Sequence, residues 1–134
     1  DSFSKNKFSK NVKIVPFVEN LSSLLKDIDL IITRAGASTI AEITAIGLPA
    51  ILIPSPYVAN NHQYYNALSL KNSNASTLIE QKDLNKDILI KTIDEILDNK
   101  DLYNTYHNNL LKLSISNSST IIYESIKKLI NEEK

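Results

Sequence analysis

Two kinds of hydrophobic pattern alternate along the first eighty residues of the chain. Short continuous apolar runs bounded by turn-forming residues are typical of buried parallel strands, and apolar residues spaced by three or four positions are typical of helices. The pattern predicts strands over 12–15, 30–33, 50–53 and 75–79, with helices over 20–28, 38–46 and 61–70 between them. This alternation indicates an α/β fold with a Rossmann-like parallel sheet and right-handed crossovers.

The remainder of the chain follows only the helical pattern. It predicts helices over 88–97, 102–113 and about 118–130, with residues 117–120 as the break between the last two. The last helix carries an apolar stripe made of Ile122, Ile126, Leu129 and Ile130. We therefore predict a single domain with a flexible arm over about 1–11, an α/β core over 12–80 and a helical tail over 86–131.

The sequence contains only two glycines, and both flank the predicted helix 38–46. Gly47, followed by Pro49, is typical of a helix C-terminus. Gly36 lies between a buried strand and a helix that we expect to begin near Ala37 or Ser38. Such a helix start presents free backbone N–H groups and a partial positive charge, which suit a phosphate. The segment from Thr33 to Pro49 is therefore the first candidate for a binding site.

Each polar residue of this segment also has a purely structural interpretation. Gly36 allows either a tight turn with positive φ or the close approach of a ligand. Ser38 and Thr39 either cap the helix or donate hydroxyls to phosphate, and Arg34 either clamps phosphate or pairs with a nearby acid. Glu42, about one turn into the helix, either interacts only with the helix dipole or accepts two ribose hydroxyls.

A second polar group follows the proline-rich loop over residues 54–57. His62 and Asn66 share a helix face, with Gln63 beside them, at the predicted start of the helix 61–70. These side chains suit sugar hydroxyls, although capping and surface polarity also explain them. The loops 16–20, 34–39 and 54–63 each follow a predicted strand and therefore lie at the carboxyl edge of the sheet. Parallel sheets of this kind bind their ligands at that edge.

Composition excludes several other classes of function. The 134 residues carry 15 basic and 15 acidic side chains, so the net charge of zero argues against a nucleic-acid partner. There is no cysteine, and the two histidines, His62 and His107, are far apart, so we expect neither a metal site nor a cofactor. We predict His107 as a surface residue, Tyr64 and Tyr65 as packing residues, and the N-terminal lysines as part of a solvated arm.

Three segments together resemble the MurG family: Arg34–Ile43, Gly47–Pro54 and Asn61–Ala67. This family of bacterial transferases adds N-acetylglucosamine from UDP-N-acetylglucosamine to the undecaprenyl-linked muramyl-pentapeptide precursor of peptidoglycan. Many two-domain (GT-B) glycosyltransferases share the Arg-x-Gly-Ala…Glu element alone. Its combination with His-Gln-x-x-Asn-Ala is more specific, and the resemblance extends from about Val12 to Ile79.

The resemblance implies a role for each candidate residue. Backbone groups of the loop with Phe17 and Val18 would hold uracil, and the helix start would face the diphosphate. Glu42 would bind the ribose hydroxyls. Gln63 and Asn66 would hold hydroxyls of N-acetylglucosamine, with His62 nearby. The reaction would be an inverting displacement with UDP as the leaving group and no obligatory metal. The predicted substrate-binding residues are Phe17, Val18, Arg34, Gly36, Ala37, Ser38, Thr39, Glu42, His62, Gln63 and Asn66.

The resemblance also implies parts that this sequence does not contain. Family members have an N-terminal domain that binds the lipid acceptor and supplies the catalytic base, and a glycine-rich phosphate loop. We therefore expect the C-terminal, donor-binding half of a GT-B inverting hexosyltransferase, inactive alone, from a cytoplasmic protein peripheral at the inner face of the membrane. The apolar stripe of the final helix would otherwise meet the N-terminal domain, so we expect self-association. The alternatives are another UDP-sugar glycolipid synthase of this fold and a non-catalytic donor-binding subunit of a two-chain glycosyltransferase.

Overall fold

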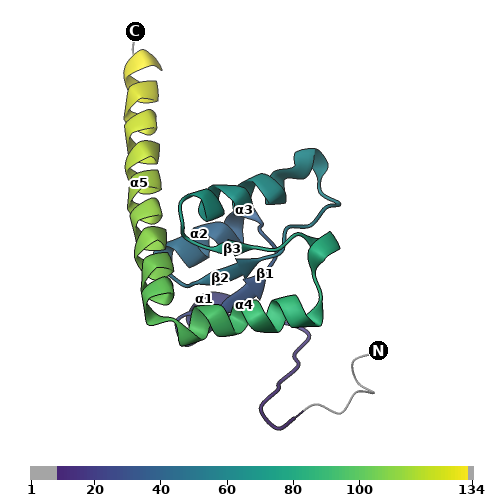
Figure 1. The fold of residues 1–134 in the computed structure, drawn as a ribbon. Coiled ribbons are helices and arrows are strands. Elements are labelled where there is room, and N and C mark those ends of the chain that lie inside the picture. The colour runs from purple at the N-terminus through teal and green to yellow at the C-terminus, as the bar shows by residue number, and fades with distance from the viewer. Residues whose placement is uncertain (1–8, 133–134) are drawn as a thin grey trace.

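The computed structural model describes residues 9–132, without the side chains of 115–126, 128 and 132. Three short strands form a parallel sheet in the order β1-β2-β3, with bounds Ile31–Thr33, Ala50–Leu52 and Thr77–Leu78. The helices are α1 (Leu21–Leu25), α2 (Ala37–Ile46), α3 (His62–Asn72), α4 (Lys86–Asp98) and α5 (Lys100–Glu132). This parallel α/β arrangement confirms the predicted fold class (Figure 1).

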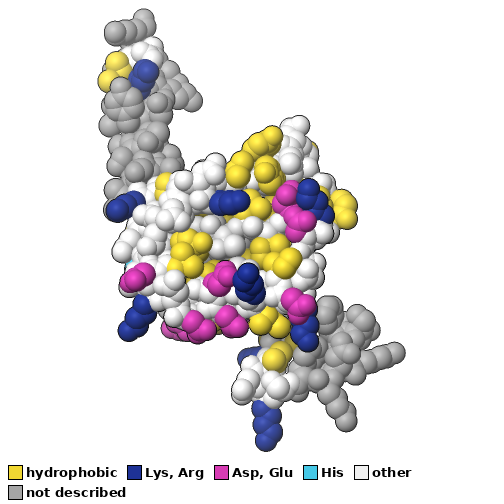
Figure 2. All heavy atoms as spheres, viewed as in Figure 1, with side chains coloured by type: hydrophobic (Ala, Val, Ile, Leu, Met, Phe, Trp, Pro, Cys, Tyr) yellow, Lys and Arg dark blue, Asp and Glu magenta, His cyan; other side chains and the backbone are white. Residues whose placement is uncertain are grey.

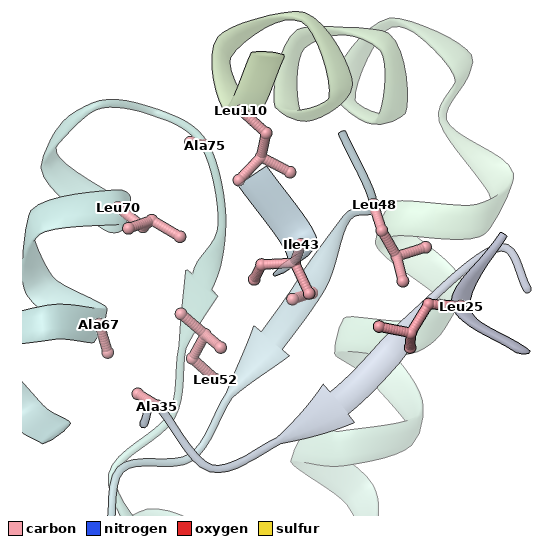
Figure 3. Close-up of a cluster of buried hydrophobic side chains, with 10 residues drawn as sticks. Leu25, Ala35, Ile43, Leu48, Leu52, Ala67, Leu70, Ala75 and Leu110 are labelled. Carbon is pink, nitrogen blue, oxygen red and sulfur yellow. The ribbon is translucent and has the colours of Figure 1, made fainter. Parts of the chain in front are cut away.

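The central strand β2 is buried on both of its faces. Leu52 packs into a cluster with residues of α1, α2 and α3, whereas Ile51 packs into a second cluster with Ile96 of α4. Figure 3 shows Ile43 of α2 and Leu52 directed into the first cluster. The sheet is therefore covered by α2 and α3 on one face and by α4 on the other, and burial of both faces explains the uninterrupted apolar run of β2.

The first half of α5 closes the amino-terminal edge of the sheet. Its Leu110 belongs to the first hydrophobic cluster and its Tyr106 to the second. Four α5 side chains also hydrogen-bond to segments just before the strands or at their start. These are Tyr103 Oη to Asp29 O (2.7 Å), Tyr106 Oη with Thr77 Oγ1 (2.9 Å), His107 Nδ1 to Gly47 O (2.6 Å) and Asn109 Nδ2 to Asn74 O (2.8 Å).

Two of these anchoring side chains have unusual environments. His107 is partly buried against the C-terminus of α2, so its prediction as a surface residue is wrong. Its Nδ1 carries the proton, because the carbonyl oxygen of Gly47 can only accept a hydrogen bond. Burial and the nearby Asp29 carboxylate raise the pKa of the Tyr103 hydroxyl above its ordinary value of 10.0. The helix α5 is therefore held against the sheet by two hydrogen-bond donors, the hydroxyl of Tyr103 and the Nδ1–H of His107.

The expected strand over residues 12–15 does not form. Val12, Ile14 and Val15 are 50%, 51% and 43% exposed, and no ladder joins them to the sheet. In this structure β1 pairs with β2 alone. The sequence pattern reports the preference of branched side chains for extended backbone, but this preference alone does not form a ladder, and residues 12–15 do not pair with the outer edge of β1.

The expected break at residues 117–120 is also absent, because α5 continues from Lys100 to Glu132. This stretch contains no glycine or proline, and each Asn, Ser or Thr costs a helix only a few tenths of a kcal/mol. The last turns of α5 extend beyond the sheet, with Leu129 and Ile130 exposed (Figure 1). The other two residues of the predicted stripe, Ile122 and Ile126, lie outside the described side chains. Within the described residues, no helix is long and apolar enough to cross a membrane.

The two glycines offer a matched test of this packing. Gly47 has φ +67°, and a Cβ there would lie 2.6 Å from His107 Nδ1 and 2.9 Å from Leu111 Cγ, whereas a Cβ on Gly36 would meet nothing within 4 Å. We expect Gly47→Ala to lower the free energy of unfolding by about 2–4 kcal/mol, from the left-handed backbone and the overlap with α5.

The control Gly36→Ala should change that free energy by less than about 1 kcal/mol, because its φ of −68° suits any residue. Urea unfolding followed by circular dichroism measures both variants. Equal losses in the two variants would contradict the close approach of α5 to Gly47.

Candidate functional site

The loops after β1 and β2 are joined at the carboxyl edge of the sheet. Arg34 donates from Nη1 to the carbonyl oxygens of Ile53 (3.2 Å) and Pro54 (3.4 Å). The guanidinium therefore ties the two loops together through Nη1, and no ion pair with an acid forms among the described residues. The consequence is that the two loops bearing the candidate residues hold a fixed position relative to each other. The role of Arg34 as a phosphate clamp stays a prediction.

Gly36 is the N-cap of α2 and has extended backbone, with φ −68° and ψ 152°. It therefore does not use the positive φ that glycine permits. No side chain caps this helix, so the interpretation of Ser38 and Thr39 as caps is wrong. The N–H groups of the first turn, on Ala37, Ser38 and Thr39, have no partner within the helix. Because the space around Gly36 is open, an anion can approach them closely.

Glu42 lies on the second turn of α2 and has unused hydrogen-bonding capacity. Its Oε2 atom is buried and accepts no hydrogen bond from the described residues. The side chain borders a hollow of about 140 Å³ between α1 and α2, which Leu25 and Lys26 also line. A carboxylate oxygen that is shielded from water and unpaired costs free energy, so this position favours a hydroxyl donor.

Phe17 and Val18 precede α1, which forms the other wall of this hollow. Asn20 caps α1 by accepting a hydrogen bond from the backbone N–H of Ser23 at 3.1 Å. Phe17 is 78% exposed, and Val18 is partly buried. The structure therefore places this segment directly before α1, with the aromatic ring of Phe17 open to solvent.

Gln63 and Asn66 each use one end of their amide group to hold a loop. Gln63 Oε1 accepts a hydrogen bond from the backbone N–H of Ser55 at 2.8 Å, and Asn66 Nδ2 donates to the carbonyl of Ala35 at 3.0 Å. The opposite ends, Gln63 Nε2 and Asn66 Oδ1, make no hydrogen bond to the described part of the chain. One donor and one acceptor are therefore available beside the start of α2.

The start of α3 is built from two residues in the left-handed backbone region. Asn60 has φ 57° and Asn61, the N-cap, has φ 55° without a side-chain cap. No local pattern indicated these two conformations, although asparagine tolerates that region better than most residues. His62 is exposed at the first position of α3, and within the described residues no acidic side chain hydrogen-bonds to it. The structure thus does not assemble an acid–base pair around His62.

The structure brings the candidate residues of α2 and α3 to one edge, with a helix start, a carboxylate and two amide groups. No group of three potential metal-ligating side chains occurs among the described residues. The chemistry available there is hydrogen bonding to an anion and to hydroxyl groups, which are the features of a nucleotide sugar.

Comparison with known proteins agrees with this geometry. Residues 1–122 match the glycosyltransferase family 28 C-terminal domain. The chain is 42% identical over 122 residues to the UDP-N-acetylglucosamine–N-acetylmuramyl-(pentapeptide) pyrophosphoryl-undecaprenol N-acetylglucosamine transferase of Bacillus cytotoxicus, covering 91% of this chain and 34% of the relative. It is 46% identical over 120 residues to the protein of the same name from Thermoanaerobacter sp. (strain X514), covering 90% and 33%.

Solved structures show the same fold. The crystal structure of MurG from Acinetobacter baumannii matches with a TM-score of 0.71 and 27% identity, covering 87% of this chain and 35% of that protein. The spinosyn forosaminyltransferase SpnP matches with the same TM-score and 18% identity, covering 94% and 33%, so this second likeness concerns the fold alone. This chain spans about a third of the length of these relatives. Its sequence match over nearly all of its length shows that the chain belongs to the glycosyltransferase family 28 C-terminal domains.

Proposed function

We propose that this chain is the UDP-N-acetylglucosamine-binding part of a transferase that adds N-acetylglucosamine to an undecaprenyl-linked muramyl-pentapeptide in peptidoglycan synthesis. The single observation that carries the proposal is the arrangement of α2. Gly36, with free space around it, is the N-cap of α2, and Glu42 lies on the second turn with its buried Oε2 unpaired among the described residues. The names of relatives 42–46% identical to this chain support the same donor.

Each part of the donor then has a partner in the chain. The diphosphate faces the N–H groups at the start of α2, where the partial positive charge of the helix favours it. The ribose hydroxyls bind Glu42, and the uracil lies against the segment of Phe17 and Val18. The free amide ends of Gln63 and Asn66 bind hydroxyls of N-acetylglucosamine, with His62 nearby.

The contribution of this chain to catalysis is electrostatic. Negative charge develops on the diphosphate oxygen as the glycosidic bond to UDP breaks during an inverting displacement. The N–H groups of the first turn of α2 are already oriented toward that charge, so they stabilise it without reorganisation. We place the acceptor-binding site and the catalytic base in another domain of a longer protein. That protein lies at the cytoplasmic face of the membrane. The 134-residue chain by itself binds the donor without turnover.

The first test changes the charge at the helix start while keeping its capping chemistry. Asp and Asn are both strong N-cap residues, so Gly36→Asp and Gly36→Asn should leave the free energy of unfolding unchanged or slightly higher. Gly36→Asp should weaken UDP binding at least tenfold more than Gly36→Asn, because only the aspartate repels the diphosphate. Isothermal titration calorimetry measures both affinities, and equal affinities would exclude a diphosphate at this position.

A second test concerns the ribose. Glu42→Gln keeps the shape of the side chain but weakens its hydrogen bonds to hydroxyls, so UDP affinity should fall about tenfold. The same substitution should have a smaller effect on 2′-deoxy-UDP, which lacks one of the two hydroxyls. An equal loss for both ligands would contradict the assignment of Glu42 to the ribose. Asn66→Ala is a less decisive variant, since it also removes the hydrogen bond to Ala35.

We also propose that the distal half of α5 mediates self-association. Support comes from the exposed Leu129 (62%) and Ile130 (53%) on a helix that extends beyond the sheet. Sedimentation equilibrium should detect a dimer that Leu129→Glu together with Ile130→Glu dissociates. A monomeric wild-type chain at every concentration would overturn this part of the proposal.

A further inference from the structure

Arg34 is the only arginine in a chain that otherwise relies on lysine for positive charge. A guanidinium differs from an ammonium because its N–H groups lie in one rigid plane, so it can hold acceptors in a fixed geometry. On the face shown in Figure 2, basic side chains are dispersed among acidic ones and are not gathered into a patch. The hydrogen-bonding geometry of Arg34 therefore distinguishes it from the lysines more than its charge does.

Arg34 binds the chain where backbone pairing between β1 and β2 ends. Within the described residues, the last backbone hydrogen bond of this pairing joins the N–H of Ile53 to the carbonyl of Thr33 at 2.9 Å. Beyond it, Nη1 of Arg34 donates to the carbonyls of Ile53 (3.2 Å) and Pro54 (3.4 Å). The arginine side chain thus continues the pairing that the backbone of β1 no longer provides.

The loop 53–57 carries this constraint to α3. Pro54 and Pro56 have a restricted φ and no N–H, so few backbone torsions of the loop are free. Between them, the N–H of Ser55 donates to Gln63 Oε1 at 2.8 Å, and the N–H of Tyr57 donates to Ser55 Oγ at 3.3 Å. A shift of Pro54 is therefore transmitted through one peptide unit to the side-chain amide of Gln63.

The hydrogen bond from Ser55 also decides which end of the Gln63 amide is free. A backbone N–H group can only donate, so the amide oxygen faces Ser55 and Nε2 points the other way. The terminal torsion of a glutamine is broad, so without this partner the amide would rotate between donor and acceptor orientations. A donor that is already oriented loses less conformational entropy when a ligand binds.

We infer that Arg34 is a positioning residue for sugar recognition, which acts through the loop 53–57 to orient Gln63 toward the N-acetylglucosamine of the donor. The inference rests on the proposed function for the identity of that ligand. A phosphate clamp acts on the diphosphate directly and changes the affinities for UDP and UDP-N-acetylglucosamine by the same factor. A positioning residue of this kind acts on the sugar, so it changes the ratio of the two affinities.

The test compares the affinities of the chain for UDP-N-acetylglucosamine and for UDP by isothermal titration calorimetry. Arg34→Met keeps an unbranched stem but removes both hydrogen bonds, so the ratio of the first affinity to the second should fall about fivefold. Arg34→Lys keeps a donor for these carbonyls and should restore most of the ratio. Gln63→Ala should lower the ratio by a similar factor, and adding Arg34→Met to it should lower the ratio no further, because both act through one amide.

Hydrogen exchange of the Ser55 amide, followed by NMR, gives a second measurement that needs no ligand. This amide should lose protection in Arg34→Met and regain it in Arg34→Lys. The control is the amide of Ile79, which donates to the carbonyl of Leu52 at 3.0 Å on the other side of β2 and should stay protected in both variants. A general loss of stability would instead expose both amides.

The outcomes separate this inference from the proposed function. A wild-type chain that binds neither nucleotide contradicts the proposed function, and the exchange of Ser55 then still decides whether Arg34 controls the loop. The inference is overturned if Arg34→Met leaves the affinity ratio unchanged, if Arg34→Lys lowers the ratio as far, if the effects of Arg34→Met and Gln63→Ala multiply, or if Ser55 stays protected in Arg34→Met.

Discussion

The burial of β2 on both faces is the constraint on which the rest of the structure depends. A strand of three residues can be fully buried only if helices cover both faces of the sheet and a strand pairs with each of its edges. Here α2 and α4 cover the faces, and β1 and β3 pair with the edges. Its neighbours are parallel to it, so all three strands end at the same edge. The loops that carry chemistry meet there because of this packing, and hydrogen bonds between them then hold their relative positions.

At that edge, binding and folding use the same side chains. Arg34, Gln63 and Asn66 join the loops through backbone carbonyl and N–H groups, which fixes their positions before a ligand arrives. Preorganisation of this kind reduces the entropy lost on binding. Glu42 differs from them, because its buried oxygen serves no internal contact that the described residues show. It is the residue of this edge whose role the fold alone does not explain.

Most of the elements could be predicted from the sequence, because continuous apolar runs and helical spacing report burial directly. The helix 38–46 and its Gly47 terminus followed from local chemistry, and the helix start near Asn61 did as well. Several of the errors concern partners that lie far away in the sequence. Residues 12–15 form no ladder with the edge strand β1, and the hydrogen bond of His107 crosses sixty positions to Gly47. For the same reason, no local pattern indicated that Arg34 or Asn66 would bind a distant carbonyl.

The position of α5 has a consequence for the order in which the molecule is made. Both hydrophobic clusters take a side chain from this last helix, and its hydrogen bonds reach back as far as Asp29, 74 positions earlier. A nascent chain that has not yet released Leu110 from the ribosome therefore holds an open sheet with its apolar amino-terminal edge unprotected. Such contacts of long sequence separation slow folding and leave intermediates prone to association. Both clusters can therefore be completed only after α5 has been synthesised.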